Sequence, residues 1–415
     1  MKPIRLPEPP GSGMEIPEIF TGGGANVVHR AVVIGSGSTS TESQCLGLVR
    51  ALGLADHLTL YRVTRPSGGI NEWLHLLPIS MHKLIDQVLR QLFRNTRFAL
   101  AVQGRKPYRV LNGGYVGLSS VLEVDTKKIV ATARGTFDKE GPTLVVACGW
   151  DTISYSSSIR HLASENVFVI QIQHPRSRLD RFDLVVTPRH DYYALTASGQ
   201  QEVPWLFRRW ITPQESPGGN VVLTVGALHQ ADSAALRLAA IAWHDELAPL
   251  PKPLLIVNIG GPARNCKYGV DLVRQLITSL DNVLDSCGSV RISFSRRTPQ
   301  KVSDIIFKEF AEHPKVYIWD GEDSISMLSE ACSTGYAVFS ICMTSGKKPV
   351  YVIGTEHCKW KFSAFHKTLR ERGVVRPFTG LEDISNSWSY PPLNDAIEVA
   401  TRVREVIAER GWTVG

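Results

Sequence analysis

The chain has 415 residues, a formal net charge of +7, and 43% hydrophobic and 20% charged residues. This composition excludes a disordered, collagen-like or coiled-coil protein, and at about 150 residues per domain the length predicts two or three domains. The longest apolar run, Tyr336–Met343, is far shorter than the roughly 18 residues that a membrane-spanning helix needs. No membrane span is therefore expected.

The N-terminal segment and the cysteines indicate a cytosolic protein. The segment is rich in proline and acidic residues and lacks an apolar core, so neither a signal peptide nor a transit peptide is expected. Seven cysteines, an odd number in a long chain, favour reduced thiols, and their spacing predicts no metal site. The basic residues are scattered and form no nucleic-acid motif, so we expect no nucleic-acid partner.

Residues 1–28 form a Pro/Gly-rich N-terminal arm, and strand and helix patterns then alternate up to residue 211. The pattern predicts strands at Ala31–Gly35, Leu58–Val63, Leu144–Cys148, Val167–Ile172 and Leu184–Val186. It predicts helices at Glu42–Leu54 and Ile153–Ser164. A long amphipathic stretch at Asn71–Phe93 contains Pro78, and residues 103–117 are predicted to be a polar loop. Short apolar strands separated by amphipathic helices are typical of parallel sheets. We therefore predict an N-terminal Rossmann-like domain over residues 29–211.

Residues 212–220 make the best linker in the chain, with two prolines and two glycines, and the alternation restarts after it. The pattern predicts strands at Val221–Val225, Leu254–Ile259, Val290–Phe294, Val316–Trp319 and Val350–Ile353, and helices at Asp232–Leu247, Gly269–Leu284, Val302–Phe310 and Asn394–Ala408. A second Rossmann-like domain is therefore predicted over residues 221–415. The predicted fold class is α/β, with two parallel sheets, a cleft between them, and ligands at the carboxyl ends of the strands.

Gly35-Ser36-Gly37 follows the first strand and precedes a helix, where backbone N–H groups can approach a phosphate. The third glycine of the dinucleotide-binding fingerprint is replaced by Ser40, and Arg62 stands at the end of the second strand where an acidic residue is expected. A tight strand–helix turn is therefore the favoured interpretation, and dinucleotide binding is the alternative.

Two loops of the second half follow neighbouring predicted strands. One contains Gly260, Gly261 and Pro262, and the other contains Ser295, Arg296, Arg297, Thr298 and Pro299. Because both loops lie at strand carboxyl ends, they would face the same cleft. Glycine amides, two guanidiniums and two hydroxyls would bind a diphosphate. The alternative is two solvated polar loops.

A helical spacing over 324–332 places Ser326, Ser329 and Glu330 on one face. Hydroxyls and a carboxylate at a helix start would hold ribose or sugar hydroxyls, and the alternative is an N-capped surface helix.

Two post-strand loops of the first half carry histidines. His190 and Asp191 are neighbours in sequence, and a His–Asp pair would act as a general base with its orienting carboxylate. No nucleophile motif accompanies the pair, so a structural histidine is the favoured interpretation. Gln173–Arg176 leaves the same alternatives open.

Taken in order, these motifs resemble the plant ELM (elongated mitochondria) fission-factor family. The resemblance rests on Gly35–Gly37, Gln173–Arg176, Thr187–Tyr193, Asn258–Pro262, Ser295–Pro299, Ser324–Gly335, Pro349–Val352, His357–Trp360 and Trp388–Leu393. It covers nearly the whole chain and is specific. It implies a GT-B-like pair of Rossmann-like domains related to glycosyltransferases.

The resemblance also implies a function. Family members sit on the cytosolic face of the mitochondrial outer membrane and bring a dynamin-related GTPase there for fission, so we expect a peripheral adaptor with a cytosolic pool, no cofactor and no catalytic residue. The alternative is a glycosyltransferase, or a non-catalytic sensor, that takes a nucleotide sugar in the cleft. Gly260, Gly261, Arg296 and Arg297 would then hold the diphosphate, and Ser326, Ser329 and Glu330 the donor hydroxyls.

The chain departs from the family between residues 322 and 348. Relatives place a further strand-containing stretch between the positions that match Glu322 and Asp323, whereas this chain instead inserts Tyr336–Lys347 later on. The inserted run Tyr336–Met343 has the length and composition of a strand. This run follows the predicted helix at 324–332, whereas the missing strand preceded that helix. We therefore expect the run to replace the missing strand poorly and Ser324–Glu330 to be displaced. We also expect a lower melting temperature than that of a version with the usual family sequence. We also expect 320–348 to be the least ordered region after the N-terminal arm.

Overall fold

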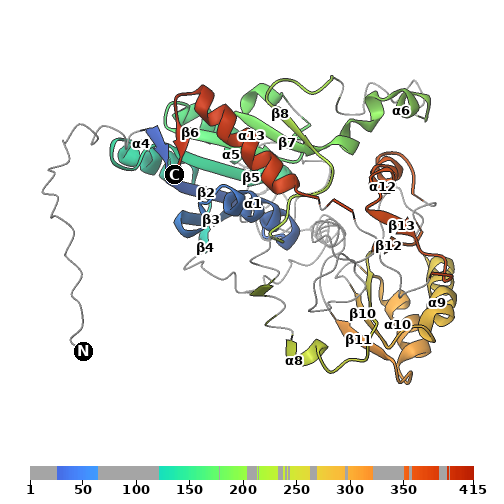
Figure 1. Ribbon diagram of the computed structural model, residues 1–415. Helices are drawn as coiled ribbons and strands as arrows, with labels where there is room; N and C mark the ends of the chain where they lie inside the picture. The colour runs from blue at the N-terminus through green and yellow to red at the C-terminus, as the bar shows by residue number, and fades with distance from the viewer. Residues whose placement is uncertain are drawn as a thin grey trace, which may run out of the picture.

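The fold is seen in a computed structural model (Figure 1). It describes residues 26–63, 121–176, 178–202, 213, 215–231, 237–238, 241, 244–261, 269–294, 298–320, 350–354, 358–382, 390–391 and 393–415. The predicted stretches Asn71–Phe93, 103–117 and Tyr336–Met343 lie outside these residues, as does most of Asp232–Leu247.

The first unit is a seven-stranded sheet in the order β4-β3-β2-β5-β6-β7-β8, and each adjacent pair is parallel. Its strands are β2 (Arg30–Gly35), β3 (Leu58–Arg62), β4 (Val121–Glu123), β5 (Thr143–Cys148), β6 (Val167–Ile172), β7 (Leu184–Pro188) and β8 (Val221–Thr224). Every residue of β5 and β6 is buried, as central strands of a parallel sheet require.

Helices cover both faces of this sheet. The helices of the first unit are α1 (Thr39–Ala51), α4 (Thr126–Glu140), α5 (Ile153–Ala163), α6 (Ala197–Glu202) and α13 (Asp395–Glu409), with short 3-10 turns at Ala55–His57, Trp150–Thr152, Leu179–Arg181 and η7 (Arg189–Leu195). Along β5, Leu144 and Val146 pack in one cluster with α1 and α13, whereas Val145 packs in the cluster that holds α4 and α5. The two-residue alternation of a strand thus divides the core into two layers.

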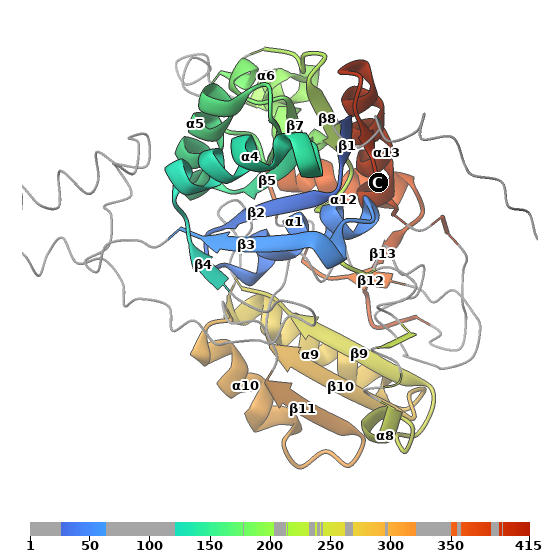
Figure 2. The same ribbon diagram turned by 90° about the vertical axis from the view of Figure 1, so that its left-hand side faces the viewer.

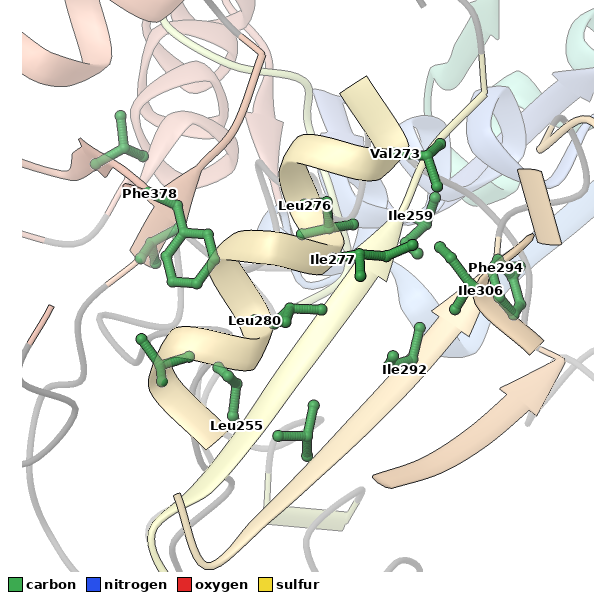
Figure 3. Packing of buried hydrophobic residues seen from close by; sticks show 14 of the residues in the cluster. Leu255, Ile259, Val273, Leu276, Ile277, Leu280, Ile292, Phe294, Ile306 and Phe378 are labelled. Carbon is green, nitrogen blue, oxygen red and sulfur yellow. The ribbon is translucent and has the colours of Figure 1, made fainter. Parts of the chain in front are cut away.

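The second unit contains two smaller parallel sheets (Figure 2). One has the order β11-β10-β9 and the other pairs β12 with β13. The elements are α8 (His244–Leu247), β9 (Leu254–Ile259), α9 (Val270–Leu284), β10 (Ser289–Phe294), α10 (Gln300–Phe310), β11 (Val316–Asp320), β12 (Val350–Val352), α12 (Lys361–Glu371) and β13 (Val375–Pro377). Helix α9 packs on β9 and β10 through Leu276, Ile277 and Leu280 (Figure 3).

The predicted α/β class with two sets of parallel strands is confirmed, but one strand and one helix lie elsewhere than expected. Strand β8 was expected to open the second sheet, and it pairs instead with β7 as the edge strand of the first. Helix α13 returns to the first sheet as well, as Figure 1 shows, and β14 (Thr413–Val414) pairs with β1 (Val27–Val28). The 212–220 linker therefore precedes the last strand of the first sheet, because a local apolar pattern does not specify which sheet a strand joins.

Cysteine chemistry departs from the prediction at one position. Cys45, Cys148 and Cys287 are buried free thiols. Cys358 is disulfide-bonded, so the expectation that all seven cysteines are reduced is wrong there.

Candidate functional site

The carboxyl edge of the β11-β10-β9 sheet brings together two loops that carry predicted site residues. Gly260 and Gly261 directly follow β9, and Thr298 lies in the loop between the neighbouring strand β10 and α10. The Thr298 hydroxyl donates to the Ile259 carbonyl oxygen at 2.8 Å and to the Gly260 carbonyl oxygen at 3.3 Å. These two contacts of the Thr298 hydroxyl connect the two loops at one edge of the sheet.

The remaining predicted site residues lie outside the described part of the chain. These are Ser295, Arg296, Arg297, Ser326, Ser329 and Glu330. Helix α10 begins after Pro299 without a side-chain cap. The binding of a ligand at this edge, and the role of the two guanidiniums, remain predictions.

The Gly35–Gly37 loop of the first sheet holds a carboxylate of the chain itself. Glu42, from the first turn of α1, accepts the Gly37 backbone N–H through Oε1 at 3.0 Å. Arg62, at the end of β3, donates to the same carboxylate from Nε to Oε1 and from Nη2 to Oε2, each at 2.7 Å. This two-point ion pair is the strong geometry for a guanidinium and a carboxylate.

The position of Glu42 explains why the dinucleotide fingerprint is incomplete. Its side chain has no solvent exposure, and a Cβ at Gly35 would lie 2.5 Å from Oε1. Glycine is therefore required at position 35, because a side chain there would collide with the Glu42 carboxylate. A phosphate at this loop would have to displace Glu42 from both Gly37 and Arg62. The geometry supports the tight-turn interpretation over dinucleotide binding.

A contact between the two units joins η7 to α12. The Asp191 carboxylate accepts the Thr187 hydroxyl at 2.9 Å and the Lys361 ammonium at 2.8 Å. The His190 ring packs against Phe365 of α12, with 5.1 Å between ring centroids. We call these residues, together with His366, the η7–α12 seam.

The His190–Asp191 pair predicted as a candidate general base is not arranged as one. Among the described residues, the hydrogen bonds of Asp191 come from Thr187 and Lys361, and Nδ1 of His190 is buried without a partner. Burial, together with the nearby Lys361 and His366, lowers the pKa of His190 to about 4, against the effect of Asp191. This is the structural histidine that the sequence favoured.

The pKa values of His366 and Asp191 in the seam are also shifted. Burial, followed by the charge of Arg370, lowers the pKa of His366 to about 4. Burial raises the pKa of Asp191, but the Lys361 ammonium and the hydrogen bond from Thr187 outweigh it and hold that pKa below its usual value. At neutral pH the seam therefore contains two neutral histidines beside one ion pair.

Backbone strain gathers at the carboxyl edge of the first sheet and at the start of α12. In the described part of the chain, the non-glycine residues with positive φ are Gln173 (71°), Arg176 (50°) and Trp360 (57°). The Arg176 guanidinium carbon lies 4.1 Å from the ring centroid of Trp150. Lys361 carried no sequence signal, because α12 was not predicted as a helix, and Trp360 entered only through the resemblance motif His357–Trp360. Such strain persists only where surrounding contacts hold it.

Within the described residues, no helix combines the length and apolarity needed to cross a bilayer, and no group of acidic, histidine or cysteine side chains is arranged to hold a metal ion.

Comparison with known proteins identifies the family. The family model "Mitochondrial fission ELM1" matches residues 40–322 and 321–407. The mitochondrial fission protein ELM1 of Arabidopsis thaliana is 57% identical over 437 aligned residues, covering 100% of both chains. The uncharacterized protein RP120 of Rickettsia prowazekii is 26% identical over 302 residues, covering 64% of this chain and 80% of its own.

Among solved structures, a UDP-GlcNAc 2-epimerase from Methanocaldococcus jannaschii is similar in fold, with a TM-score of 0.45 at 10% identity over 90% of this chain and 98% of its own. The family match spans far more than half of the sequence, and the Arabidopsis protein aligns along its entire length. The chain therefore belongs to the mitochondrial fission ELM1 family.

Proposed function

We propose that this protein is a peripheral adaptor that recruits a dynamin-related GTPase to the cytosolic face of the mitochondrial outer membrane. A role in mitochondrial fission follows from the family, and the full-length match at 57% identity is the observation that carries it. Recruitment of the GTPase, and the outer-membrane location, are the steps that the proposal adds.

The glycine loop of the first sheet supports an adaptor rather than a dinucleotide-dependent enzyme. Glu42 and Arg62 form an ion pair and neutralise each other's charge at the position that a bound phosphate would occupy. The first unit therefore presents a closed, internally paired loop. An adaptor needs a rigid surface for its partner and has no need of turnover at this position.

Relocation tests the recruitment step directly. The protein is fused to an endoplasmic-reticulum membrane anchor in cells that lack the native copy, and the dynamin-related GTPase is imaged. An adaptor carries the GTPase to the new membrane, whereas the anchor alone leaves it in place. If the anchored, folded protein fails to shift the GTPase, the recruitment proposal is wrong.

The outer-membrane location has its own test. Alkaline carbonate should strip the native protein from isolated mitochondria, and protease added to intact organelles should degrade it. Resistance to carbonate, or protection from protease, contradicts a peripheral position on the outer face.

A second candidate is binding of a nucleotide sugar, by an enzyme or by a sensor without turnover. The hydrogen bond from Thr298 to Ile259 favours it, because it fixes two loops at one strand edge beside Gly260 and Gly261. We expect nucleotide sugars to raise the melting temperature at saturating excess, and Arg296→Ala with Arg297→Ala to abolish that shift.

The matched control for the double variant is Lys127→Ala with Lys128→Ala, which removes the same charge from exposed positions on α4. Sugar transfer lost only in the arginine variant would favour a glycosyltransferase. A melting shift without transfer would favour a sensor, and no shift with any nucleotide sugar rules out this second candidate.

A further inference from the structure

The positive charge of the chain is concentrated in one short segment of the second unit. Residues 359–376, all of which the structure describes, contain six basic side chains and one acidic one, a net charge of +5. The whole chain carries +7, so the other 397 residues together contribute only +2. The segment begins just before α12 and ends in β13.

Five of these six basic side chains are exposed. Lys361 is the exception, because its ammonium is bonded to the Asp191 carboxylate in the η7–α12 seam at 2.8 Å. Lys367 lies 3.8 Å from Glu371, but these two side chains are 76% and 64% exposed, and such a surface pair neutralises charge only weakly. The exposed side chains are Lys359, Lys367, Arg370, Arg372 and Arg376.

Helix α12 buries one side and presents a basic side to solvent. Phe365 and Leu369 are four positions apart and are both buried in the core cluster of the second unit. Ser363, Lys367 and Arg370 follow one another at intervals of four and three residues, so they share the opposite side, and all three are exposed. Figure 1 shows α12 at the margin of the molecule, where this side is open to a large partner.

Trp360, at the start of α12, is exposed and held in a strained conformation. It is 41% exposed, and its φ of 57° lies in the left-handed region that disfavours large side chains. The Ala364 N–H donates to its carbonyl oxygen at 3.1 Å, and the next residue, Lys361, is fixed by Asp191. The chain thus keeps an indole where glycine would fit without strain. Strain of this kind points to a function of the exposed ring.

Lys359 lies at the end of the helix where a positive charge is unfavourable. The amino end of a helix carries a partial positive charge and is stabilised by acidic side chains. The first turn of α12, which the structure describes completely, contains no acidic side chain, and Lys359 and Lys361 flank its N-cap instead. Asp191 compensates Lys361. The charge of Lys359 therefore does not stabilise α12, and an external anion at this position would.

We propose that Lys359, Trp360, Ser363, Lys367 and Arg370, which we call the α12 basic surface, bind the surface of a membrane that contains anionic lipids. Basic side chains attract the phosphates of such lipids, and an indole ring favours the boundary between head groups and acyl chains. A membrane accommodates both at once. The inference rests on the proposed peripheral position at a membrane and adds the surface that makes the contact.

Vesicle flotation of the purified full-length protein tests the charges. We expect binding to vesicles of one part phosphatidylinositol and three parts phosphatidylcholine, and little binding to phosphatidylcholine alone. Lys359→Gln with Lys367→Gln and Arg370→Gln should weaken binding by roughly tenfold or more, since each basic residue near an anionic surface contributes a factor of about five. High salt should weaken binding of the wild type in the same way.

The matched control for the triple variant is Lys127→Gln with Lys128→Gln and Lys139→Gln. It removes the same charge from exposed positions on α4, in the first unit. It should bind anionic vesicles as tightly as the wild type. Equal weakening in both triple variants would show that only the net charge of the protein matters, and would overturn the proposal.

Trp360→Gly tests the ring separately from the fold. Glycine adopts the φ of 57° without strain, so the variant should still unfold cooperatively. Its binding to anionic vesicles should nevertheless weaken, and brominated phosphatidylcholine in the vesicles should quench less tryptophan fluorescence than in the wild type. Tyr317→Thr, which removes an aromatic side chain of similar exposure (42%) from β11, is the control and should leave binding and quenching unchanged.

The vesicle assay and the proposed function can fail independently. Binding to anionic vesicles by a protein that is absent from mitochondria would refute the proposed function and support the α12 basic surface. Equal binding of the wild type to neutral and anionic vesicles would overturn the inference. Absence of vesicle binding by the wild type, with loss of mitochondrial association in the Lys359 triple variant, would also overturn it, because the surface would then bind an acidic protein.

Discussion

Glu42 is fully buried, and its negative charge is balanced by one guanidinium, that of Arg62, whose side chain is 16% exposed. The pair sits between the end of β3 and the first turn of α1, with the Gly37 N–H as a third contact. Removing one partner of a buried pair leaves the other charge without compensation, so the loss exceeds the net contribution of the intact pair.

We predict that Glu42→Ala lowers the free energy of unfolding by about 3–5 kcal/mol. Urea denaturation monitored by fluorescence measures it. The control is Asp180→Ala, which breaks an ion pair with Arg178 whose side chains are 81% and 59% exposed, and it should leave the urea midpoint unchanged. The double variant Glu42→Leu with Arg62→Met should recover part of the loss. A midpoint for Glu42→Ala equal to the wild type would show that Glu42 does not hold the loop.

The Gly35–Gly37 loop shows what could be predicted from single residues of the sequence. Ser40 and Arg62 already argued against a dinucleotide, because each replaces a residue that the fingerprint needs. The sequence did not disclose that Arg62 faces Glu42, since the two are 20 positions apart and lie on different elements. Their pairing depends on the parallel register of β2 and β3, which places Gly35 opposite Arg62.

At the scale of elements, the η7–α12 seam joins parts of the chain that are 170 positions apart. Its two histidines are neutral in the folded protein, with pKa values of about 4 against 6.5 for an unperturbed imidazole. The unfolded chain therefore binds protons first as the pH falls. The stability that the neutral rings contribute is present above pH 6.5 and is lost as the pH falls toward 4.

We predict that the free energy of unfolding falls between pH 6.5 and pH 4 by up to about 3 kcal/mol for each histidine, at 1.36 kcal/mol per pH unit. Urea titrations at pH 7.0, 6.0, 5.0 and 4.5 measure the decline. His190→Gln with His366→Gln should flatten it relative to the wild type, and His244→Gln, on exposed α8, is the control for the substitution itself. A decline equally steep in the double variant would place the acid sensitivity elsewhere.

Most strands were predictable as elements, and several helices and edge strands were not. Strands β5, β6, β9 and β10 are short apolar runs bounded by turn residues, so their predicted bounds agree with the structure to within one residue. Helix α4 was missed because its apolar face is weak, although Asp125 caps its start by accepting the Lys127 and Lys128 N–H groups. The β1–β14 pair has no local signal, since its two strands come from opposite ends of the chain.

At the scale of the whole molecule, α13 makes the first unit depend on the end of the chain. Val399, Val403 and Ile407 are buried against the first sheet in the same cluster as Leu48 and Val146. Arg410 and Arg160 both bond the Asp183 carboxylate, which also accepts the Val169 N–H, and so fix the end of α13 to β6 and α5. The Asp395 carboxylate accepts the N–H groups of Val225 and Gly226 at 2.8 Å and fixes its start.

These contacts decide whether the predicted boundary at 212–220 separates independent folding units. Burying a Val or Ile side chain contributes roughly 1.5–3 kcal/mol, so Val399, Val403 and Ile407 together contribute about 4.5–9 kcal/mol. A domain has only about 5–15 kcal/mol of net stability. A chain that ends at residue 211 loses this contribution and also β8, which leaves β7 as an unpaired apolar edge.

We therefore predict that residues 1–211 alone unfold without cooperativity and that this fragment binds a hydrophobic dye. Extension to residue 225 should restore β8 without restoring folding. Co-expression of 1–211 with 212–415 as separate chains should give a soluble complex, because β8 and α13 then return to the first sheet in trans. Val403→Asp on the second chain should abolish the complex, whereas Thr401→Asp, on the exposed face of α13, should preserve it. Cooperative unfolding of 1–211 by itself would show that the first sheet is complete without the returning helix and that the linker is a true domain boundary.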